Sequence, residues 1–392
     1  MDICYISEYV PPSSFGGVET VVAGEASYMR KEGHTTFLIT FDRAKNKIEI
    51  KEDDIFGQRY VIRHRKYSDT KSMLKKQVLL FFSFFNITDV IQVRRILKKE
   101  KPDIIHLHLV TNLFLRAYLS TKHNCIYTSH DYSLLCPKGG LYKKKGYLCK
   151  RPFFICHLWR IISMTCVPPR IIAVSNYMKK ILLPYYKKPL QLIQLNNFIT
   201  EEYFKNIHKK VPKARDKFII IFIGRLQKQK GVHLLIEAFR QLAYRNVELW
   251  IIGDGEESSS LKRAAGQDSH IHFWGRLNHK DLASYLEKAD VLVAPSLCPE
   301  TFGIVLIEAM AYGIPIIASR IGAFTEIIAD NENGILIQPG NVDYIRYALE
   351  EIIANETLYS EISKNNINKA KEYSLVIHGQ KLIEIYGSIL GL

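Results

Sequence analysis

The sequence lacks the features that mark membrane-spanning, secreted and metal-scaffold proteins. No stretch approaches the roughly 18 consecutive apolar residues of a transmembrane helix, and residues 1–7 read as a strand, so no signal peptide is expected. The seven cysteines are scattered and form no Cys-x-x-Cys pair, which favours reduced thiols over a disulfide framework. No Asp-x-Asp metal motif, internal repeat or low-complexity tract occurs. These absences favour a cytoplasmic globular protein.

Acidic residues are outnumbered in one half of the chain only. Residues 1–200 hold 32 Lys and Arg against 15 Asp and Glu, a balance of +17. Residues 201–392 hold 22 against 24, a balance of −2, and the two sum to the net charge of +15. Such asymmetry indicates halves with different tasks. The basic half suits anionic lipid headgroups, an anionic acceptor or nucleic acid, or it serves solubility alone.

What is present is the pattern of an α/β protein. Apolar strands alternate with helices along the chain, which predicts parallel sheets covered on both faces. At 392 residues the chain is long enough for two domains. A polar, basic stretch over 196–217 separates them. We predict doubly wound, Rossmann-like domains over 1–200 and 201–373, and a closing helix over 374–392.

Two carboxylates mark the most informative segment. Glu300 follows a strand predicted over 290–294, and Glu308 lies about two turns into a helix predicted from residue 302. Burying a carboxylate in so apolar a run is unfavourable unless a partner compensates it. The carboxyl end of a strand is also where a doubly wound domain binds its ligand. Ordinary salt bridges on a buried helix are the alternative.

This segment resembles the Glu-x7-Glu motif of the retaining GT-B glycosyltransferases of family 4. The likeness includes the preceding proline, the Phe-Gly pair and the continuation Ala-Met-Ala-Tyr-Gly-Ile-Pro. The resemblance implies two Rossmann-like domains facing a central cleft, with the closing helix crossing back to the first. It implies that Glu308 holds the ribose of a sugar nucleotide and that Glu300 lies against the donor sugar. Backbone N–H groups at the helix N-terminus would bind sugar and phosphate: Thr301, Phe302, Gly303 and Ile304.

A basic turn follows the strand predicted over 218–223. Arginine offers a planar fork to phosphate oxygens and lysine a compact charge, so Arg225 and Lys230 could neutralise a departing diphosphate. A solvated basic turn is the alternative. The turn is similar to the family's Gly-Arg-x4-Lys-Gly motif, which implies that both residues bind the diphosphate. Further donor contacts are implied for three residues after later strands, which resemble the family's base-framing loops: Gly253, Arg276 and Leu277.

The first half offers weaker candidates. Gly16 and Gly17 open a helix after the first strand, where a ligand can approach the backbone. They resemble the family's Gly-Gly loop at the donor diphosphate or the acceptor, and a simple turn is the alternative. His130 follows a predicted strand and resembles the family's histidine near the donor sugar, although a satisfied, half-buried histidine is common. His106 and His108 alternate on a strand and are interpreted as structural, with His108 close enough to its end to reach the cleft.

Two segments leave their interpretation open. The run Val-Leu-Leu-Phe-Phe-Ser-Phe-Phe over 78–85 is flanked by basic residues, which suits an interfacial membrane helix or a core helix equally well. A cysteine set is interpreted as reduced thiols, with a structural metal site as the weaker alternative: Cys136, Cys149, Cys156 and Cys166.

The resemblance implies how the reaction proceeds. In this family no carboxylate generally stands where it could form a covalent intermediate, so the leaving phosphate would accept the proton of the attacking hydroxyl. The expected catalytic residues are Glu300, His130, Arg225 and Lys230. Because Arg225 and Lys230 would carry the phosphate charge, no cofactor and no divalent metal is expected. Domain closure would exclude water.

The implied partners are a UDP- or GDP-sugar and a saccharide or lipid-linked saccharide acceptor, as in capsule or lipopolysaccharide synthesis. The basic first domain could contact the inner face of the cytoplasmic membrane, and no nucleic acid is expected. A GT-B nucleotide-sugar 2-epimerase is the first rival, but it should display more cleft carboxylates and histidines. A nucleic-acid-binding protein would explain the charge but not the paired motifs of the second half.

Overall fold

The computed structural model describes residues 1–8, 16–42, 49–63, 85–137, 139–140, 149, 154–185, 191–204, 217–244 and 246–392. The chain divides into two compact units. The first comprises residues 1–140, 152–196 and 375–392, and the second comprises 141–151 and 197–374. The boundary after Asn196 compares with a predicted boundary after residue 200.

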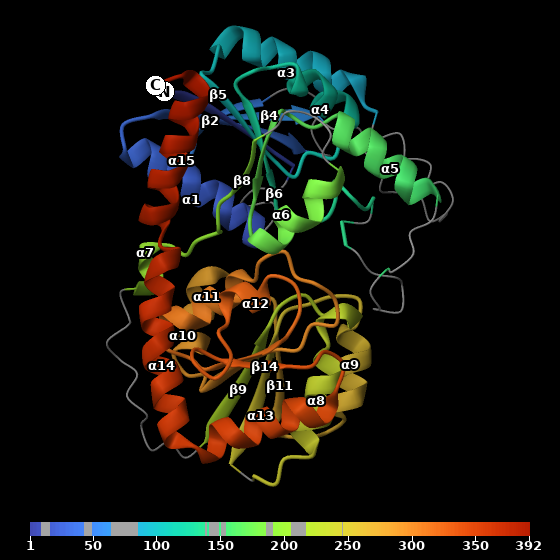
Figure 1. Cartoon of the computed structure of the whole chain (residues 1–392), viewed down its shortest axis with the longest axis vertical. Coiled ribbons are helices and arrows are strands. Elements are labelled where there is room, and N and C mark those ends of the chain that lie inside the picture. The colour runs from blue at the N-terminus through green and yellow to red at the C-terminus, as the bar shows by residue number, and fades with distance from the viewer. Residues whose placement is uncertain are drawn as a thin grey trace. The chain divides into compact units, whose positions relative to one another are not determined.

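The first unit is built on an eight-stranded sheet, several strands of which are labelled in Figure 1. The strand order is β3-β4-β2-β1-β5-β6-β7-β8. Neighbouring strands run parallel except β3 and β4, which pair as an antiparallel hairpin at one edge. The order reverses between β1 and β5, which makes their carboxyl ends a topological switch point. The strands are β1 (Asp2–Ser7), β2 (Thr35–Asp42), β3 (Glu49–Asp53), β4 (Gly57–Arg63), β5 (Ile104–His108), β6 (Cys125–Ser129), β7 (Arg170–Ala173) and β8 (Gln191–Gln194).

The core of the first unit joins distant parts of the sequence. Apolar residues of α1 recur at helical spacing, at Val22, Ala26 and Met29, and share one cluster with Leu382 and Tyr386 of α15. The unit's last helix therefore completes a core that begins in its first. Its helical segments are α1 (Gly17–Lys31), α3 (Ile87–Glu100), α4 (Leu113–Ser120), α5 (Phe154–Thr165), α6 (Asn176–Leu182), η1 (Leu183–Tyr185) and α15 (Leu375–Leu390).

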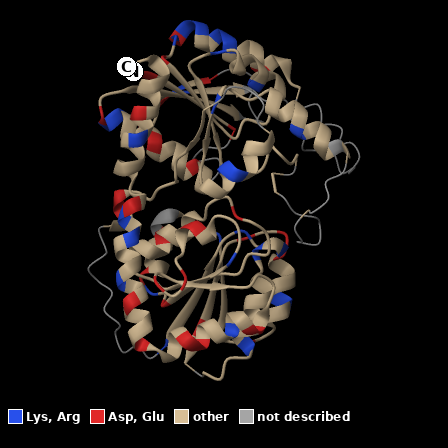
Figure 2. Ribbon diagram, in the orientation of Figure 1, with Lys and Arg blue, Asp and Glu red and all other residues tan. Residues whose placement is uncertain are grey.

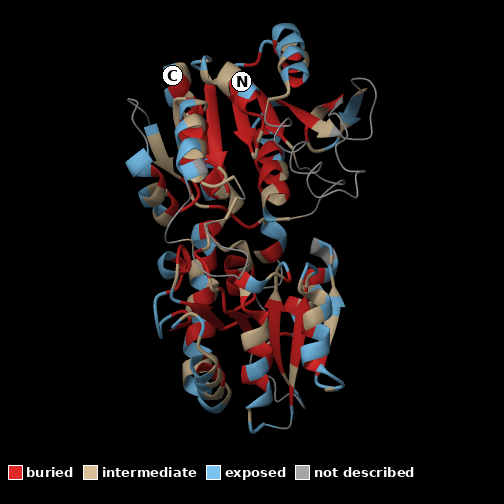
Figure 3. Ribbon diagram, turned by 90° about the vertical axis from the view of Figure 1, so that its right-hand side faces the viewer, coloured by how far each residue is buried: buried red, intermediate tan, exposed pale blue. Residues whose placement is uncertain are grey.

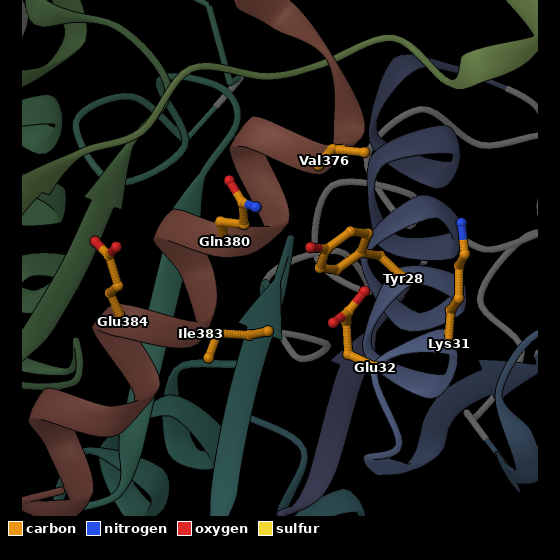
Figure 4. Close-up of a pocket in the computed structure, with 7 residues that line it drawn as sticks. All are labelled: Tyr28, Lys31, Glu32, Val376, Gln380, Ile383 and Glu384. Carbon is orange, nitrogen blue, oxygen red and sulfur yellow. The ribbon is translucent and has the colours of Figure 1, made fainter.

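The contact between α1 and α15 requires a glycine. A Cβ at Gly379 would stand 2.3 Å from the ring of Tyr28, so no larger residue fits without a shift. A surface groove runs along the same contact, and none of the predicted site residues lines it (Figure 4). The residues that line it are Tyr28, Lys31, Glu32, Val376, Gln380, Ile383 and Glu384.

The second unit is built on a six-stranded parallel sheet in the order β11-β10-β9-β12-β13-β14. The chain runs outward from β9 to β11 and then returns to β12 on the other side of β9, so the switch point lies between β9 and β12. Figure 3 shows the buried strands of both sheets in red. The strands are β9 (Phe218–Ile223), β10 (Val247–Ile252), β11 (Ile271–Gly275), β12 (Val291–Ala294), β13 (Ile316–Ser319) and β14 (Ile335–Ile337).

Helices connect these strands and close the unit. An amphipathic α8 packs Leu235, Ile236 and Phe239 into a core shared with the sheet and with α13. Among the described residues, no helix has both the length and the apolar content to cross a membrane. The helical segments are α7 (Glu201–Phe204), η3 (Lys228–Lys230), α8 (Val232–Arg240), α9 (Ser258–Ala265), α10 (His279–Leu286), α11 (Ile304–Ala311), α12 (Phe324–Ile327), α13 (Val342–Ala354), α14 (Glu356–Ala370) and η4 (Lys371–Tyr373).

Sequence prediction missed several short or polar elements. The hairpin of β3 and β4 was not predicted, because Glu49–Asp53 reads Glu-Ile-Lys-Glu-Asp and edge strands of this kind carry charge rather than an apolar alternation. The helices α4, α5 and α12 and the strand β14 were also missed. The helix predicted from residue 302 begins at Ile304. Of the aromatic run 78–85, only Phe85 lies among the described residues.

Candidate functional site

The predicted residues of the second half gather at the switch point of the second sheet. The loop after β9 carries Arg225 and Lys230, and the loop after β12 leads to Glu300. A backbone hydrogen bond of 2.7 Å from Leu297 N to the Gln229 carbonyl ties the two loops together. Arg225 is exposed there. The carboxyl ends of β9 and β12 thus hold cationic and anionic side chains where this class of sheet binds ligands.

Glu300 and Lys230 form an ion pair at this end of the sheet. Lys230 Nζ lies 2.7 Å from Glu300 Oε1, although the two residues are 70 apart in the sequence. The Ser296 hydroxyl donates to the same oxygen at 2.7 Å. The lysine and glutamate side chains are 28% and 20% exposed, so both remain within reach of a ligand. The sequence predicted both residues but not their direct contact.

Glu308 lies deeper, on α11. It is buried, and the hydroxyl of Tyr203 donates to its Oε1 at 2.7 Å. Burial, reinforced by the charge of Glu308, raises the pKa of Tyr203, so this phenol remains a donor. Sequence reasoning missed Tyr203, because the pair is 105 residues apart and no motif surrounds the tyrosine.

The turn before α11 carries the other predicted donor residues. Phe302 is buried and packs edge-on against Tyr373, with ring centroids 5.9 Å apart, while Gly303 immediately precedes the helix. Thr301 and Ile304 are half-buried beside them. The backbone N–H groups of the first helical turn therefore begin at the predicted segment.

Three loops at this end of the sheet support one another. Leu226 N donates to the Asp254 carbonyl at 2.9 Å, and Gly253 N donates to the Gly275 carbonyl at 2.7 Å. Gly253 has a φ of +137°, and a Cβ there would lie 1.8 Å from the Gly224 carbonyl oxygen. Only glycine allows these backbones to approach so closely. Arg276 and Leu277 follow at the end of β11, with Arg276 exposed.

The first unit holds the remaining predicted residues. Gly17 is the first residue of α1, and Gly16 precedes it and accepts a hydrogen bond from the Thr20 hydroxyl at 3.1 Å. The residues before them, 9–15, lie outside the described part of the chain. His130 follows β6 and is buried, and burial together with the charge of His378 lowers its pKa to about 3. This imidazole is therefore neutral near pH 7.

His130 belongs to a buried polar cluster, of which the sequence indicated single histidines but not their contacts. Nε2 of His130 lies 2.9 Å from Nδ1 of His108. Burial lowers the pKa of His106 and of His108 well below the ordinary range, and the neighbouring histidines add to that shift. The interpretation of His106 and His108 as structural side chains left out the contact of His108 with His130.

Glu25 of α1 lies at the centre of this cluster. Its Oε1 lies 3.1 Å from Nε2 of His378 on α15, and its Oε2 lies 3.4 Å from Nε2 of His108 and 3.5 Å from Nδ1 of His106. Burial raises the pKa of Glu25, while His378 opposes that shift. Glu25 was not predicted, although an acidic residue next to Ala26 in the apolar stripe of α1 was a signal.

The same cluster contains the ligand atoms that could hold a metal ion among the described residues: one each from Glu25, His106 and His108. Both nitrogens of His106 already have partners, at 2.7 Å from the Tyr386 hydroxyl and 2.7 Å from the Thr128 hydroxyl. A metal would therefore have to displace Tyr386. Among the described residues, the cysteine set gives no comparable group, and none of the seven cysteines is in a disulfide.

Comparison with known proteins gives consistent matches to both halves. Residues 15–195 match the family model described as Glycosyltransferase Family 4, and residues 204–369 match the one described as Glycosyl transferases group 1. An uncharacterised glycosyltransferase of Methanocaldococcus jannaschii is 31% identical over 288 residues, covering 72% of this chain and 74% of that protein. A capsular polysaccharide biosynthesis glycosyltransferase of Staphylococcus aureus is 25% identical over 395 residues, 94% of each chain.

Solved structures share the fold at low sequence identity. The crystal structure of Anabaena HepE in complex with UDP-glucose matches with a TM-score of 0.71 and 18% identity, over 99% of this chain and 100% of that one. At this identity the likeness concerns the fold alone.

Proposed function

We propose that this chain, which belongs to glycosyltransferase family 4 and has the GT-B fold, moves a sugar from a nucleotide-sugar donor to a saccharide acceptor. The configuration of the sugar would be retained. The observation that carries the proposal is the ion pair of Lys230 and Glu300 at the switch point between β9 and β12. A half-exposed cation beside a half-exposed carboxylate suits a ligand that brings both phosphate charge and sugar hydroxyls.

The donor would replace partners within this arrangement. Its diphosphate would attract Lys230 and the exposed Arg225, and Glu300 would then be available to the hydroxyls of the sugar. Glu308, buried beside the Tyr203 hydroxyl, would accept hydrogen bonds from the ribose. The UDP-glucose bound to the Anabaena relative makes a uridine donor the first to test, and a guanosine donor the second.

The chemical step would depend on charge stabilisation. As the glycosidic bond to phosphate breaks, negative charge grows on the diphosphate, and Arg225 and Lys230 would stabilise it without a divalent metal. The leaving phosphate would accept the proton of the attacking hydroxyl, so that no covalent sugar–carboxylate intermediate forms. His130 in the first unit would contact the sugar as a neutral imidazole.

The acceptor is proposed to be a lipid-linked saccharide at the inner face of the cytoplasmic membrane. Residues 132–200 contain twelve Lys and Arg and no Asp or Glu. Within this stretch, α5 exposes an apolar stripe at helical spacing, with Phe154 80%, Leu158 46% and Ile161 65% exposed. Figure 2 shows further Lys and Arg on α3 and α6. Basic charge beside exposed apolar side chains suits an anionic lipid surface.

The test is a thermal-shift panel of UDP, GDP, ADP and CMP and their common sugar conjugates. A ligand at 100 times its Kd stabilises the fold by about 2.7 kcal/mol. We expect a shift with one nucleotide in wild type and in Glu361→Ala, which removes an exposed carboxylate of α14. The shift should be absent in Glu308→Ala. An equal shift in a folded Glu308→Ala protein would overturn the ribose assignment, and donor turnover to an epimer without acceptor would favour the epimerase.

A further inference from the structure

In the buried cluster of the first unit, the hydrogen-bond contacts restrict which ring nitrogens carry protons. Glu25 faces His106 and His108 from β5 and His378 from α15. Tyr386 of α15 contacts His106, and Tyr5 of β1 packs against both histidines of β5. Glu25, His106 and His108 are at most 2% exposed as side chains. In such surroundings every N–H and every acceptor needs a partner, so the positions of the protons are coupled.

A backbone carbonyl determines which nitrogen of His378 carries a proton. Nδ1 of His378 lies 2.7 Å from the carbonyl oxygen of Asn196, which can only accept, so Nδ1 carries a proton. The 3.1 Å contact between Nε2 of His378 and Oε1 of Glu25 then holds one further proton. That proton is on the imidazole or on Oε1. In both cases Oε2, the other oxygen of Glu25, has no proton and acts only as an acceptor.

This acceptor selects the tautomer of His108. Oε2 of Glu25 lies 3.4 Å from Nε2 of His108, and neither atom has another hydrogen-bond partner within the described part of the chain. Two facing lone pairs would repel, whereas a small shift with a proton on Nε2 satisfies both buried atoms. Leaving either one unsatisfied costs about 1–3 kcal/mol. A neutral His108 therefore carries its proton on Nε2, and its Nδ1 is an acceptor.

The tautomer of His108 in turn determines the tautomer of His130, the predicted site residue. Nδ1 of His108, as an acceptor, requires a donor at Nε2 of His130, 2.9 Å away. We propose that Glu25 is a positioning residue that acts through His108 to hold the proton of His130 on Nε2, so that Nδ1 of His130 carries no proton. A catalytic use of this tautomer depends on the proposed function, whereas the tautomer itself does not.

A bound metal is the competing explanation of the same cluster. The contacts favour the chain of hydrogen bonds from Glu25 through His108 to His130, which we call the relay. A metal on Nε2 of His108 would remove the proton that satisfies Oε2, and it would break the 2.7 Å contact of His106 with Tyr386. The relay keeps every contact in place. It also explains why an acidic residue interrupts the apolar stripe of α1 directly opposite a histidine of α15.

The test reads the tautomer by NMR on the full-length chain labelled with 15N-histidine. Long-range 1H–15N spectra distinguish protonated from unprotonated ring nitrogens, and His130→Gln assigns the His130 signals among the 13 histidines. In wild type at pH 7.5 we expect His130 to carry its proton on Nε2. A proton on Nδ1 of His130 would overturn the proposal without any further variant.

Two substitutions separate positioning from packing. In Glu25→Gln the amide N–H donates to His378 and the amide oxygen faces His108, so the wild-type tautomer should persist. In Glu25→Leu the selecting oxygen is gone, and both tautomers of His130 should appear. Glu32→Leu, at an exposed position just after α1, is the control and should change nothing. An unchanged His130 spectrum in folded Glu25→Leu would overturn the proposal.

Two further readouts complete the test. Elemental analysis of the purified protein should find no stoichiometric transition metal, and one that is lost in Glu25→Leu would replace the relay with a metal site. In the nucleotide panel, Glu25→Leu should retain the wild-type thermal shift while its turnover falls. Failure of that panel in wild type would count against the proposed function, and the tautomer result would still decide the relay.

Discussion

The switch point of the second unit and the polar cluster of the first unit differ in how far they bury ionisable side chains. The second unit keeps Lys230 and Glu300 partly exposed at the switch point of its sheet, 28% and 20% as side chains. The first unit buries Glu25, His106 and His108 to 2% or less. The exposed pair can exchange partners with a ligand, whereas the buried groups can only hold one another in place. Under the proposed function, the second unit would supply charge to the reaction and the first would supply orientation.

Burial also perturbs the ionisation of the cluster in the first unit. In the first unit, burial is the largest cause of the pKa shifts of Glu25, His106, His108 and His130. Removing charge from water is unfavourable whatever the neighbours, so these groups favour their neutral forms.

The largest effect is expected from removing the positive charge of Lys230 in the second unit. Lys230→Ala should lower the turnover number about 100- to 1,000-fold, because one preorganised charge stabiliser is lost from the transition state. The stability of the fold should change by less than about 1 kcal/mol, since the pair is partly exposed. Lys228→Ala, at a neighbouring exposed position, is the control for steady-state kinetics with the donor that the panel identifies. Equal turnover in the two variants would contradict the assignment.

Acidification should affect the first unit selectively. The pKa of His130 is about 3 in the fold, below its ordinary value of about 6.5. The unfolded chain therefore binds the proton first, and stability that is present above pH 6.5 is lost as the pH falls towards 3, by about 1.4 kcal/mol per pH unit. His106 and His108 shift in the same direction and add to the loss. The raised pKa of Glu25 has the opposite sign and offsets part of it.

Amide hydrogen exchange at pH 7, 6 and 5 measures this difference unit by unit. Peptides from α1 and β5 should lose protection on acidification more steeply than peptides from β9 and β12. His130→Gln keeps a donor towards His108 but cannot titrate, so its loss should be shallower. Parallel losses in both units would contradict the assignment of the buried histidines.

A packing substitution in the first unit should have a smaller effect, on the stability of the fold. Gly379→Ala places a Cβ 2.3 Å from the Tyr28 ring, and overpacking of this kind costs about 1–3 kcal/mol. Gly387→Ala lies on the same helix with its nearest atom 3.9 Å away, and the better helix former should stabilise the protein by about 0.5–1 kcal/mol. Urea denaturation of the two variants should therefore move in opposite directions. A stabilising Gly379→Ala would show that α1 and α15 can separate freely.

The smallest expected effect concerns the surface of the first unit. Wild type should sediment with vesicles that contain phosphatidylglycerol and not with vesicles of phosphatidylcholine alone, and salt should weaken the binding. Serine at Phe154, Leu158 and Ile161 should lower the bound fraction. Serine at Tyr344 and Tyr347, which are exposed on α13 of the second unit, should not. Equal losses in both variants would contradict a lipid surface on α5.

The difference between the units also decides what the sequence could predict. Glu300, Lys230 and Glu308 belong to short motifs beside strong strands, so local pattern was enough to place them at the end of the second sheet. Glu25 and His378 are 353 residues apart, and no local pattern predicts that they meet. Tyr203 is similarly distant from Glu308.

Errors in the fold have related physical causes. Short elements such as α12 and β14 contain too few residues for a periodic pattern, and the hairpin of β3 and β4 is charged because it forms an edge. The sequence predicts helices over 342–354 and 356–371, which agree closely with α13 and α14, because their asparagine caps and apolar stripes indicate the same bounds. Local chemistry therefore accounts for most of the architecture, and tertiary contacts account for the polar cluster.

The place of α15 in the first core has a consequence for biosynthesis. When residues 1–196 have left the ribosome, Val22, Ala26 and Met29 still lack the helix that covers them, and Glu25 lacks His378. At about 5–20 residues per second, α15 follows roughly 10 to 40 s later. Throughout that interval the nascent first unit would display an apolar stripe with an uncompensated carboxylate beside it. A chaperone that binds apolar segments could occupy this stripe until α15 has been synthesised.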